Sequence, residues 1–328
     1  MRRIVILHTD VAQDAGEDEQ DTLRQAETIA QAMVSLGYEP VMLPFGLDLN
    51  VTIAKLRFLQ PYVVFNLVET LAGRGSMIYF ATALLDFLKL PYTGCRTDAM
   101  FLTSNKPLTK KILQAEGIAT PPWLTADGIA VGHAATDTYI LKASWEDASV
   151  GLDDASILRT DDRDMLLDAL QKHKQKLGMD CFAEAYIDGR EFNIALLATD
   201  QGVRILPAAE ILFQDYPPDK PKLLDYRAKW VEDSFEYDHT RRTLDIASQD
   251  ADLVNRLRDI ALTCWHLFGL RGYARVDFRI DQNGQPWVLE INANPCLSLD
   301  AGFAAALEQA SIKYSDAIDN IIHDALVG

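Results

Sequence analysis

The sequence predicts an α/β protein whose C-terminal part is of the α+β kind. In the first third of the chain, short apolar runs typical of buried strands alternate with amphipathic helices. Near the other end, residues 271–298 contain two alternating polar and apolar segments around Asn283-Gly284, the strongest short-range signal for a β-hairpin. With 328 residues, the chain is long enough for two or three domains.

The first 94 residues are expected to form an open, mostly parallel sheet. Strands are predicted at 3–7, 38–43 and 62–67, and helices at 21–36, 51–59 and 77–88. No G-x-G-x-x-G follows the first strand, which argues against a dinucleotide site of the usual oxidoreductase kind. A short extended piece, 90–94, ends this domain.

A loop crowded with carboxylates, residues 10–21, separates the first strand from the first helix. Acidic runs are usually solvated, and that interpretation stays open. The other interpretation is recognition of a substrate amine, since ligands of open α/β sheets bind at the carboxyl ends of the strands.

The middle of the chain changes to a mixture of helices and isolated strands. A helix is expected at 103–116, capped by Ser104 and with Pro107 in its first turn. A strand at 204–212 carries Glu210, an acid in an apolar strand that needs a partner. Further strands are expected at 139–142 and from 181, with helices at 164–177, 252–268 and 303–326, the last covering the C-terminal domain.

One face of the predicted hairpin is apolar. A turn at Asn283-Gly284 pairs Ile280 with Trp287, Phe278 with Leu289 and Val276 with Ile291.

The opposite face of the hairpin is polar. The same register sets Asp277 opposite Glu290 and Arg275 opposite Asn292. Opposed carboxylates have Cβ atoms roughly 5 Å apart and destabilise a hairpin, so something must compensate. A solvated acidic face is the alternative, but Mg²⁺ takes oxygen ligands of this kind and is the compensating ion we expect.

Composition excludes several classes of function. The formal net charge of −17 argues against nucleic-acid binding, so a nucleotide site would have to create its own positive potential. We find neither a signal peptide nor a transmembrane segment, so no membrane association is expected. Four scattered cysteines, without paired spacing, fit a reducing cytoplasm.

From the first strand to Ala293-Asn294-Pro295, the sequence resembles the ATP-grasp enzymes, and the D-alanine:D-alanine ligase branch in particular. The resemblance implies an N-terminal domain at 1–94, a central lid domain at 95–180 and a C-terminal catalytic domain at 181–328, with nucleotide between the last two. It also implies an ATP-dependent carboxylate–amine ligase that works through an acyl phosphate. The cofactors would be ATP and two Mg²⁺ ions, with Mn²⁺ as a substitute. The partners would be small amino acids, carboxylates or amines, and the family suggests a homodimer.

Residue roles follow from the same resemblance. Residues 143–151 resemble the family's phosphate-covering loop, in which Ser149 would contact ATP. Lys106 and Lys142 would contact the ATP phosphates, and Lys229 would reach the γ-phosphate region. Asp277, Glu290 and Asn292 would hold the metal, and Arg275 would stabilise the tetrahedral oxyanion. The adenine would lie against Glu184, Ala185 and Ile187, with the ribose on Glu191. The family's amine-binding glutamate is best matched by Glu17, Asp18 or Glu19, and the choice stays open.

The departures from the family gather at the substrate end. Cys296 stands where the ligases have an oxyanion-hole glycine, and the serine–leucine pair that follows is lost or shifted. Ala148 and Trp230 replace a serine and a tyrosine, and Val68-Glu69 replaces a histidine–glycine pair. No histidine lies near Cys296 in sequence, so it is a packing or oxyanion-hole position rather than a nucleophile.

We therefore expect a ligase with a different amino-acid or small-acid pair of substrates. The alternatives are D-alanine:D-alanine ligase proper, a non-ligating nucleotide-binding protein, a carboxylase or phosphorylating enzyme on the same scaffold, and an α/β binding protein unrelated to ATP.

Overall fold

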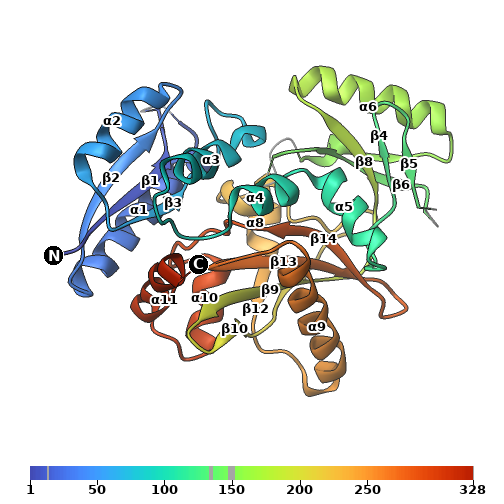
Figure 1. Cartoon of the computed structure of the whole chain (residues 1–328). Helices are drawn as coiled ribbons and strands as arrows, with labels where there is room; N and C mark the ends of the chain where they lie inside the picture. Colours follow the sequence, from blue (N-terminus) through green and yellow to red (C-terminus); the bar gives the residue numbers. More distant parts are fainter. Residues whose placement is uncertain (13–14, 133–135, 147–151, 328) are drawn as a thin grey trace.

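Three sheets organise the chain (Figure 1). The computed structural model describes residues 1–12, 15–132, 136–146 and 152–327, and within these ranges it contains a three-stranded, a five-stranded and a six-stranded sheet. No helix in these ranges is long and apolar enough to cross a membrane. The expected mixture of an α/β part and an α+β part is confirmed.

The N-terminal sheet is parallel, as expected, and is covered on both faces. Its strands, in spatial order, are β2 (Glu39–Phe45), β1 (Arg3–Thr9) and β3 (Val63–Leu67). Ile4 and Ile6 of β1 pack toward α1 (Glu17–Ser35), whereas Val5 and Leu7 pack toward α2 (Leu49–Leu59) and α3 (Tyr79–Leu88), which follows η1 (Gly75–Met77). Burial on both faces explains the continuous apolar run of β1.

Helix α1 begins at Glu17, four residues before the predicted start at 21. The residue before it, Gly16, is extended, with φ −65° and ψ 168°. Carboxylates are favourable in a first helical turn because the helix dipole is positive there. The carboxylate-rich segment is therefore partly the beginning of a helix, and interpreting all of residues 10–21 as a loop was wrong.

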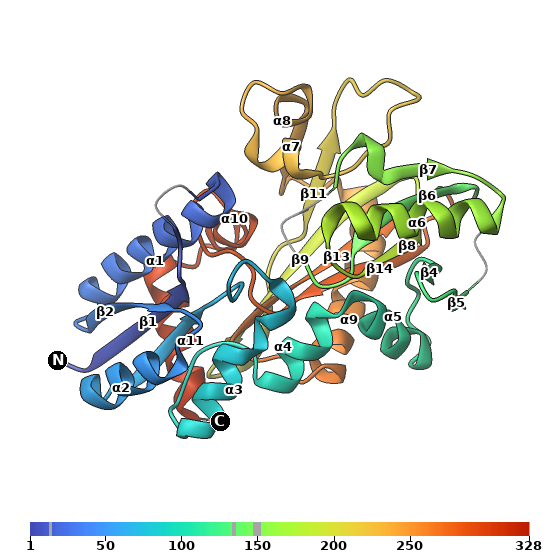
Figure 2. The same cartoon turned by 90° about the horizontal axis from the view of Figure 1, so that it is seen from above.

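The central sheet is antiparallel and carries one helix on its face (Figure 2). Its strands, in spatial order, are β5 (Ala130–Val131), β4 (Trp123–Thr125), β8 (Cys181–Ala185), β6 (Thr138–Ala143) and β7 (Ile157–Arg159). η2 (Asp154–Ser156) precedes β7, and α6 (Arg163–Leu177) packs Leu166 and Leu170 against the sheet. Because β8 pairs with both β4 and β6, we propose that the lid domain continues to Ala185 rather than ending at 180.

Two helices, not one, lie between α3 and the central sheet. The predicted helix at 103–116 is α5 (Lys106–Ala115), and its cap is Asn105, whose side chain accepts the N–H of Leu108 at 3.0 Å. The expected cap, Ser104, instead ends α4 (Thr97–Ser104), a helix that the sequence pattern did not indicate. Asn105 is extended between the two helices, so it, and not Ser104, has the backbone conformation of a cap.

The C-terminal sheet has β9 (Arg190–Thr199) and β13 (Tyr273–Ile280) at its centre. β14 (Pro286–Asn292) flanks β13, whereas β11 (Ala209–Phe213) and then β12 (Thr240–Thr243) lie beyond β9, which also pairs with β10 (Gly202–Ile205). The single strand predicted at 204–212 was wrong: Pro207 interrupts it, because proline has no N–H to donate to a ladder. Glu210 has the partner that we expected, since Arg190 Nε donates to its Oε1 at 2.7 Å.

Helices cover both faces of this sheet. α9 (Ala251–Leu267), which follows η3 (Ser248–Asp250), packs on one face together with α4 and α5. α10 (Gly302–Gln309) and α11 (Tyr314–Val327) replace the single helix predicted at 303–326, and Ser311, with φ +55°, lies in the break. α11 packs on α1 and β3 as well as on β9, so it joins the first and third sheets instead of only covering the C-terminal domain (Figure 2). Two short helices, α7 (Tyr226–Trp230) and α8 (Phe235–His239), lie between β11 and β12.

The hairpin register is confirmed at its functional end and wrong near the turn. Arg275 pairs with Asn292, Val276 with Ile291 and Asp277 with Glu290, all as predicted. The register then shifts, so Phe278 pairs with Val288 and Ile280 with Pro286 rather than with Leu289 and Trp287. The loop is longer than the Asn-Gly pattern suggests, because Asp281 Oδ1 accepts the N–H groups of Asn283 at 2.8 Å and Gln285 at 3.0 Å.

Gly189, between β8 and β9, makes the closest approach to the hairpin. Its φ is +153°, and a Cβ there would lie 1.9 Å from the carbonyl oxygen of Ile280. Only glycine therefore fits where β9 begins beside β13.

We expect Gly189→Ala to destabilise the protein more than Gly284→Ala, which is the matched control. Gly284 also has a positive φ, +76°, but no atom within 4 Å of the added Cβ, so it should cost only the left-handed penalty of about 1–2 kcal/mol. Gly189→Ala should add about 1–3 kcal/mol for overpacking against backbone. Urea unfolding measures both losses, and equal losses would contradict the close approach.

Candidate active site

The two opposed acids of the hairpin are compensated by cations of the protein. Asp277, 6% exposed, accepts both Nε and Nη2 of Arg275 at 2.7 Å, one bond to each oxygen. Asn193 Nδ2 of the neighbouring strand donates to Asp277 Oδ1, also at 2.7 Å. The destabilising pair that the sequence predicted is therefore real, and Arg275 is one of its compensating groups.

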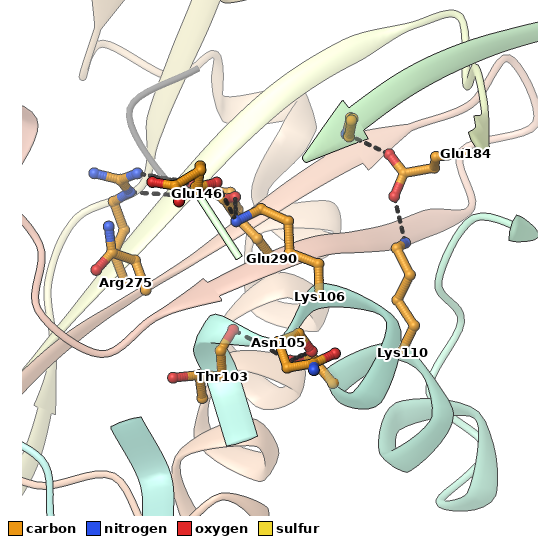
Figure 3. Close-up of polar contacts among 12 residues, drawn as sticks. Thr103, Asn105, Lys106, Lys110, Glu146, Glu184, Arg275 and Glu290 are labelled. Atoms are coloured by element: carbon orange, nitrogen blue, oxygen red, sulfur yellow. Dashed lines mark hydrogen bonds and ion pairs between the residues drawn. The ribbon is translucent and has the colours of Figure 1, made fainter. Parts of the chain in front are cut away.

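The partner acid, Glu290, is held more loosely (Figure 3). Its Oε2 lies 3.6 Å from Lys106 Nζ and its Oε1 lies 4.0 Å from Arg275 Nη2. Lys106 Nζ also donates to the backbone carbonyl of Glu146 at 2.8 Å, which ties the first turn of α5 to the segment after β6. Burial would raise the pKa of Glu290, but Lys106 and Arg275 are foremost among the cations that lower it below its usual value. Burial raises the pKa of Asp277, because Arg275 offsets only part of that effect.

Lys229 of α7 belongs to the same cluster. Burial lowers the pKa of its ammonium, and the charges that oppose this effect include Glu290 and Asp277. Three lysine- or arginine-bearing elements, α5, α7 and β13, thus bring positive charge to one pair of carboxylates.

The oxygen atoms on this face suit a hard divalent cation. Asp277 and Glu290 supply carboxylates, and Asn292 supplies an amide oxygen that also accepts the N–H of Asn294 at 2.9 Å. In the ranges that the structure describes, no group of three or more His, Cys, Asp or Glu is arranged to hold a metal ion. Two carboxylates plus an amide fit Mg²⁺, which completes its shell with water and phosphate.

Lys142 of β6 points toward Glu184 of β8, which is only 1% exposed. The other oxygen of Glu184 lies 2.5 Å from Lys110 Nζ (Figure 3). Burial would raise the pKa of Glu184, but Lys110 and Lys142 more than offset it and lower the pKa.

The other expected nucleotide residues follow along the connection from β8 to β9. The N–H of Ala185 donates to the carbonyl of Pro122 at 2.8 Å, so the backbone here is already paired with the lid sheet. Ile187 is half-buried. Glu191 is buried and pairs with Arg279 at 2.8 Å. Ser149 and Ala148 lie outside the described residues.

The residues that the sequence assigned to the substrate end lie where α1 meets the segment after β14. Cys296 Sγ donates to Asp21 Oδ2 at 3.2 Å, and Ser298 Oγ donates to the same oxygen at 3.3 Å. Burial, followed by the charges of Asp21 and Glu69, raises the pKa of Cys296 to about 12.

Among the acids at the start of the chain, Asp21 is the one whose side chain we find against this segment. Glu17 is exposed and pairs with Arg24 at 3.2 Å. The side chains of Asp18 and Glu19 lie outside the described part of the structure. Asp21 is one helical turn after Glu17, and a correct prediction of the helix start would have pointed to it.

Sequence reasoning missed several residues that shape the site. Lys110 follows Lys106 by four positions in one helix, a spacing that places both on one face and could have revealed it. Arg279 continues the polar alternation of Arg275 and Asp277, which is also a usable signal. Asn193 offers none, because its role depends on the pairing of β9 with β13.

Comparison with known proteins agrees with this geometry. Residues 133–323 match the family model described as D-ala D-ala ligase C-terminus. The uncharacterized protein y4sG of Sinorhizobium fredii is 30% identical over 310 residues, which cover 91% of this chain and 86% of that protein. The D-alanine–D-alanine ligase of Moorella thermoacetica is 28% identical over 317 residues, or 93% and 94% of the two chains.

Solved structures show the same fold. The D-alanine–D-alanine ligase of Bacillus anthracis complexed with ATP superposes with a TM-score of 0.72 at 20% identity, covering 99% of this chain and 98% of that one. The D-alanyl-alanine synthetase A of Vibrio cholerae gives 0.74 at 15% identity, covering 100% and 99%. The fold and the site thus define an ATP-grasp ligase that forms carbon–nitrogen bonds. The chain belongs to the D-alanine–D-alanine ligase family, whose ligases use ATP and Mg²⁺ and bind small-molecule substrates.

We expect Cys296 to be unreactive in the native protein. Its pKa of about 12 keeps the thiol protonated near neutral pH, and the thiolate would accumulate only as the pH rises toward that value. Labelling with a disulfide reagent at pH 8 should be slow until the protein is unfolded.

Cys296→Ala should keep turnover within several-fold of the wild type, because only a backbone amide is expected from this position. A fast-reacting thiol that Cys296→Ala removes would contradict the burial.

Proposed function

We propose that the protein joins a small carboxylic acid to an amine through an acyl phosphate, with a substrate pair different from that of D-alanine:D-alanine ligase. The observation that carries the proposal is the convergence of Lys106, Lys229 and Arg275 on the Asp277–Glu290 pair. A chain of formal net charge −17 must neutralise a triphosphate locally, and this cluster supplies the charge.

In the first half-reaction, the substrate carboxylate attacks the γ-phosphorus of ATP. The new O–P bond forms as the bond to ADP breaks. Lys106 and Lys142 bind phosphate oxygens, and Lys229 binds oxygens of the γ-phosphoryl group that is transferred. Asp277, Glu290 and Asn292 would hold Mg²⁺, which, when bound, neutralises charge on the phosphate oxygens. Two ions, and Mn²⁺ as a substitute, remain part of the proposal.

In the second half-reaction, the amine attacks the acyl carbon. The C–N bond forms, the amine loses a proton, and the C–O bond to phosphate breaks. Arg275 stabilises the oxyanion of the tetrahedral intermediate, because its guanidinium is already fixed by two bonds to Asp277. The amide of Cys296 is the second donor that we assign to this oxyanion.

For the nucleoside, we propose the connection between β8 and β9. Ala185 and Ile187 would contact the adenine through their backbone, and Glu191 would bind the ribose hydroxyls. We leave Glu184 out of the nucleoside contacts, although the sequence suggested it, because both of its oxygens lie against lysines.

The substrate end supports a changed specificity. Asp21 contacts both Cys296 and Ser298, so it is our candidate for holding a substrate ammonium, while Glu17, Asp18 and Glu19 are the candidates from sequence alone. The alternative functions are D-alanine:D-alanine ligase proper and a non-ligating nucleotide-binding protein. The buried Nε1 of Trp230, which replaces the family's tyrosine, has no hydrogen-bond partner within the described residues. The same is true of the buried Oγ1 of Thr70, which follows the replaced pair Val68-Glu69, and both observations favour the changed specificity.

Two further expectations remain proposals. Exposed Phe58 and Phe87, on α2 and α3, offer an apolar surface for a homodimer through the first domain. Light scattering would test this, and a monomer at all concentrations would exclude it.

The four cysteines are free, which supports a reducing compartment such as the cytoplasm.

The test of function is a screen for ADP and phosphate release over pairs of amino acids and small carboxylates with Mg-ATP, followed by mass analysis of the product. An amide product from a pair other than two D-alanines supports the proposal. D-alanyl-D-alanine as the dominant product favours the first alternative. ATP binding without ADP release from any pair favours the second.

We expect Glu290→Gln to lower turnover by about 10²–10³-fold, the usual cost of removing one group that stabilises transition-state charge. Chelation of Mg²⁺ should abolish turnover of the wild type, and added Mg²⁺ should restore it. Glu308→Gln, an exposed acid on α10, is the matched control and should behave as the wild type. Turnover of Glu290→Gln near the wild-type value would remove Glu290 from the metal site.

Asp21→Asn should raise the KM of one amino-acid substrate by about tenfold or more, because a charge-assisted hydrogen bond contributes on the order of 1.5–3 kcal/mol. The KM of ATP should stay unchanged. Glu17→Gln is the matched variant on the same helix, and a larger effect there than at Asp21 would reverse the assignment.

A further inference from the structure

A buried cluster of one acid and two lysines lies beside the proposed phosphate site. Glu184 is 1% exposed, Lys110 is 1% exposed and Lys142 is 17% exposed by side chain. Glu184 Oε2 lies 2.5 Å from Lys110 Nζ, and Glu184 Oε1 accepts from Lys142 Nζ. Figure 3 shows Lys110 reaching up from α5 to Glu184, on the side away from Lys106.

Several contacts hold the ammonium group of Lys110 in place. Its Nζ donates to Thr120 Oγ1 at 2.8 Å, and that hydroxyl donates to the carbonyl of Val288 at 2.8 Å. The ammonium also lies 5.9 Å from the centre of the Trp123 ring. Lys110 thus ties α5, β14 and the lid sheet together, and its charge is committed to Glu184.

Lys142 differs because it is the more exposed of the two lysines and is carried by the lid strand β6. The cluster holds two positive charges and one negative charge. If Lys110 neutralises Glu184, the charge of Lys142 is left for a bound anion. Without Lys110, the buried carboxylate would need Lys142 as its own counter-ion, since an unpaired buried charge is costly.

We propose that Lys110 is a positioning residue, which neutralises Glu184 so that Lys142 keeps its charge for the nucleotide phosphates. This rests on the proposed function, in which Lys142 binds ATP. Lys110 itself contacts no substrate. Burial outweighs the attraction of Glu184 and lowers the pKa of Lys110 to about 8, so the ammonium is the main form at neutral pH and is lost as the pH rises above that value.

The test compares the affinity for a non-hydrolysable Mg-ATP analogue in four variants. Lys110→Met should weaken binding about tenfold or more and raise the KM of ATP more than it changes kcat. Lys110→Met/Glu184→Gln should recover binding to within about threefold of the wild type, because removing both charges frees Lys142. A double variant that binds as weakly as Lys142→Ala would overturn the proposal, since Lys110 or Glu184 would then act directly.

Thr120→Val is the control for a purely structural role. It removes the hydrogen-bond partner of Lys110 but no charge, so it should lower the free energy of unfolding and leave analogue affinity within about threefold of the wild type. If Lys110→Met and Thr120→Val weaken binding in proportion to their loss of stability, the role of Lys110 is structural and the proposal is wrong. If Lys110→Met does not fold, the charge-balanced double variant alone still decides between the two outcomes.

Lys142→Ala separates this inference from the proposed function. Weak analogue binding in Lys142→Ala together with unchanged binding in Lys110→Met overturns only the role of Lys110. Unchanged binding in Lys142→Ala removes Lys142 from the phosphate site, and the proposed function then loses one of its residues.

Discussion

The opposed carboxylates of Asp277 and Glu290 impose the constraint around which the C-terminal half is built. Buried like charges on neighbouring strands are tolerated only if cations are fixed beside them. Arg275 comes from the same strand as Asp277, but Lys106 comes from the first turn of α5 and Lys229 from α7. The charges of the hairpin are therefore compensated in full only after α5 and α7 have packed onto it. Charge pairing at this site therefore depends on tertiary assembly, which sets three cations beside two carboxylates in a chain of net charge −17.

The substrate end depends on a different junction. Helix α11 packs on both α1 and β9, and the hydroxyl of Tyr38 donates to Asp319 at 2.9 Å across the same contact. This packing brings Asp21 to Cys296 and Ser298. The phosphate cluster, in contrast, lies between α5, α7 and the hairpin. Substitutions at the α1 junction can thus change the substrate contacts without disturbing the phosphate cluster. This separation explains how one chain can resemble its family closely at the hairpin while departing from it at Val68-Glu69 and Cys296.

The sequence pattern predicted those features that depend on residues close together in the chain. The hairpin, the parallel first sheet and the pairing of Asp277 with Glu290 follow from the alternation of side chains and from Asn283-Gly284. The register shift after Asp277 does not, and neither does the longer loop that Asp281 closes, because neither is signalled by the alternation or by Asn283-Gly284. The pattern showed that Glu210 needs a partner, but the identity of Arg190, on a strand twenty positions away, comes from the pairing of β9 with β11. The predicted start of the helix at 103–116 was wrong for a similar reason. Ser104 and Asn105 are both favourable N-cap residues, and only their backbone conformations decide which of them caps α5.

Lys106 and Lys110 show why residue type and spacing do not determine a role. They lie on one face of α5, about 6 Å apart along its axis. Lys106 stands at the helix start, its side chain 10% exposed, beside an acid that is held at 3.6 Å. One turn later, Lys110 is 1% exposed and contacts an acid at 2.5 Å. In the proposed function, Lys106 with its more distant acid binds phosphate, whereas the charge of Lys110 is committed to Glu184. What separates a ligand-binding lysine from a positioning lysine is the burial of the acid opposite it, and that burial exists only in the folded chain.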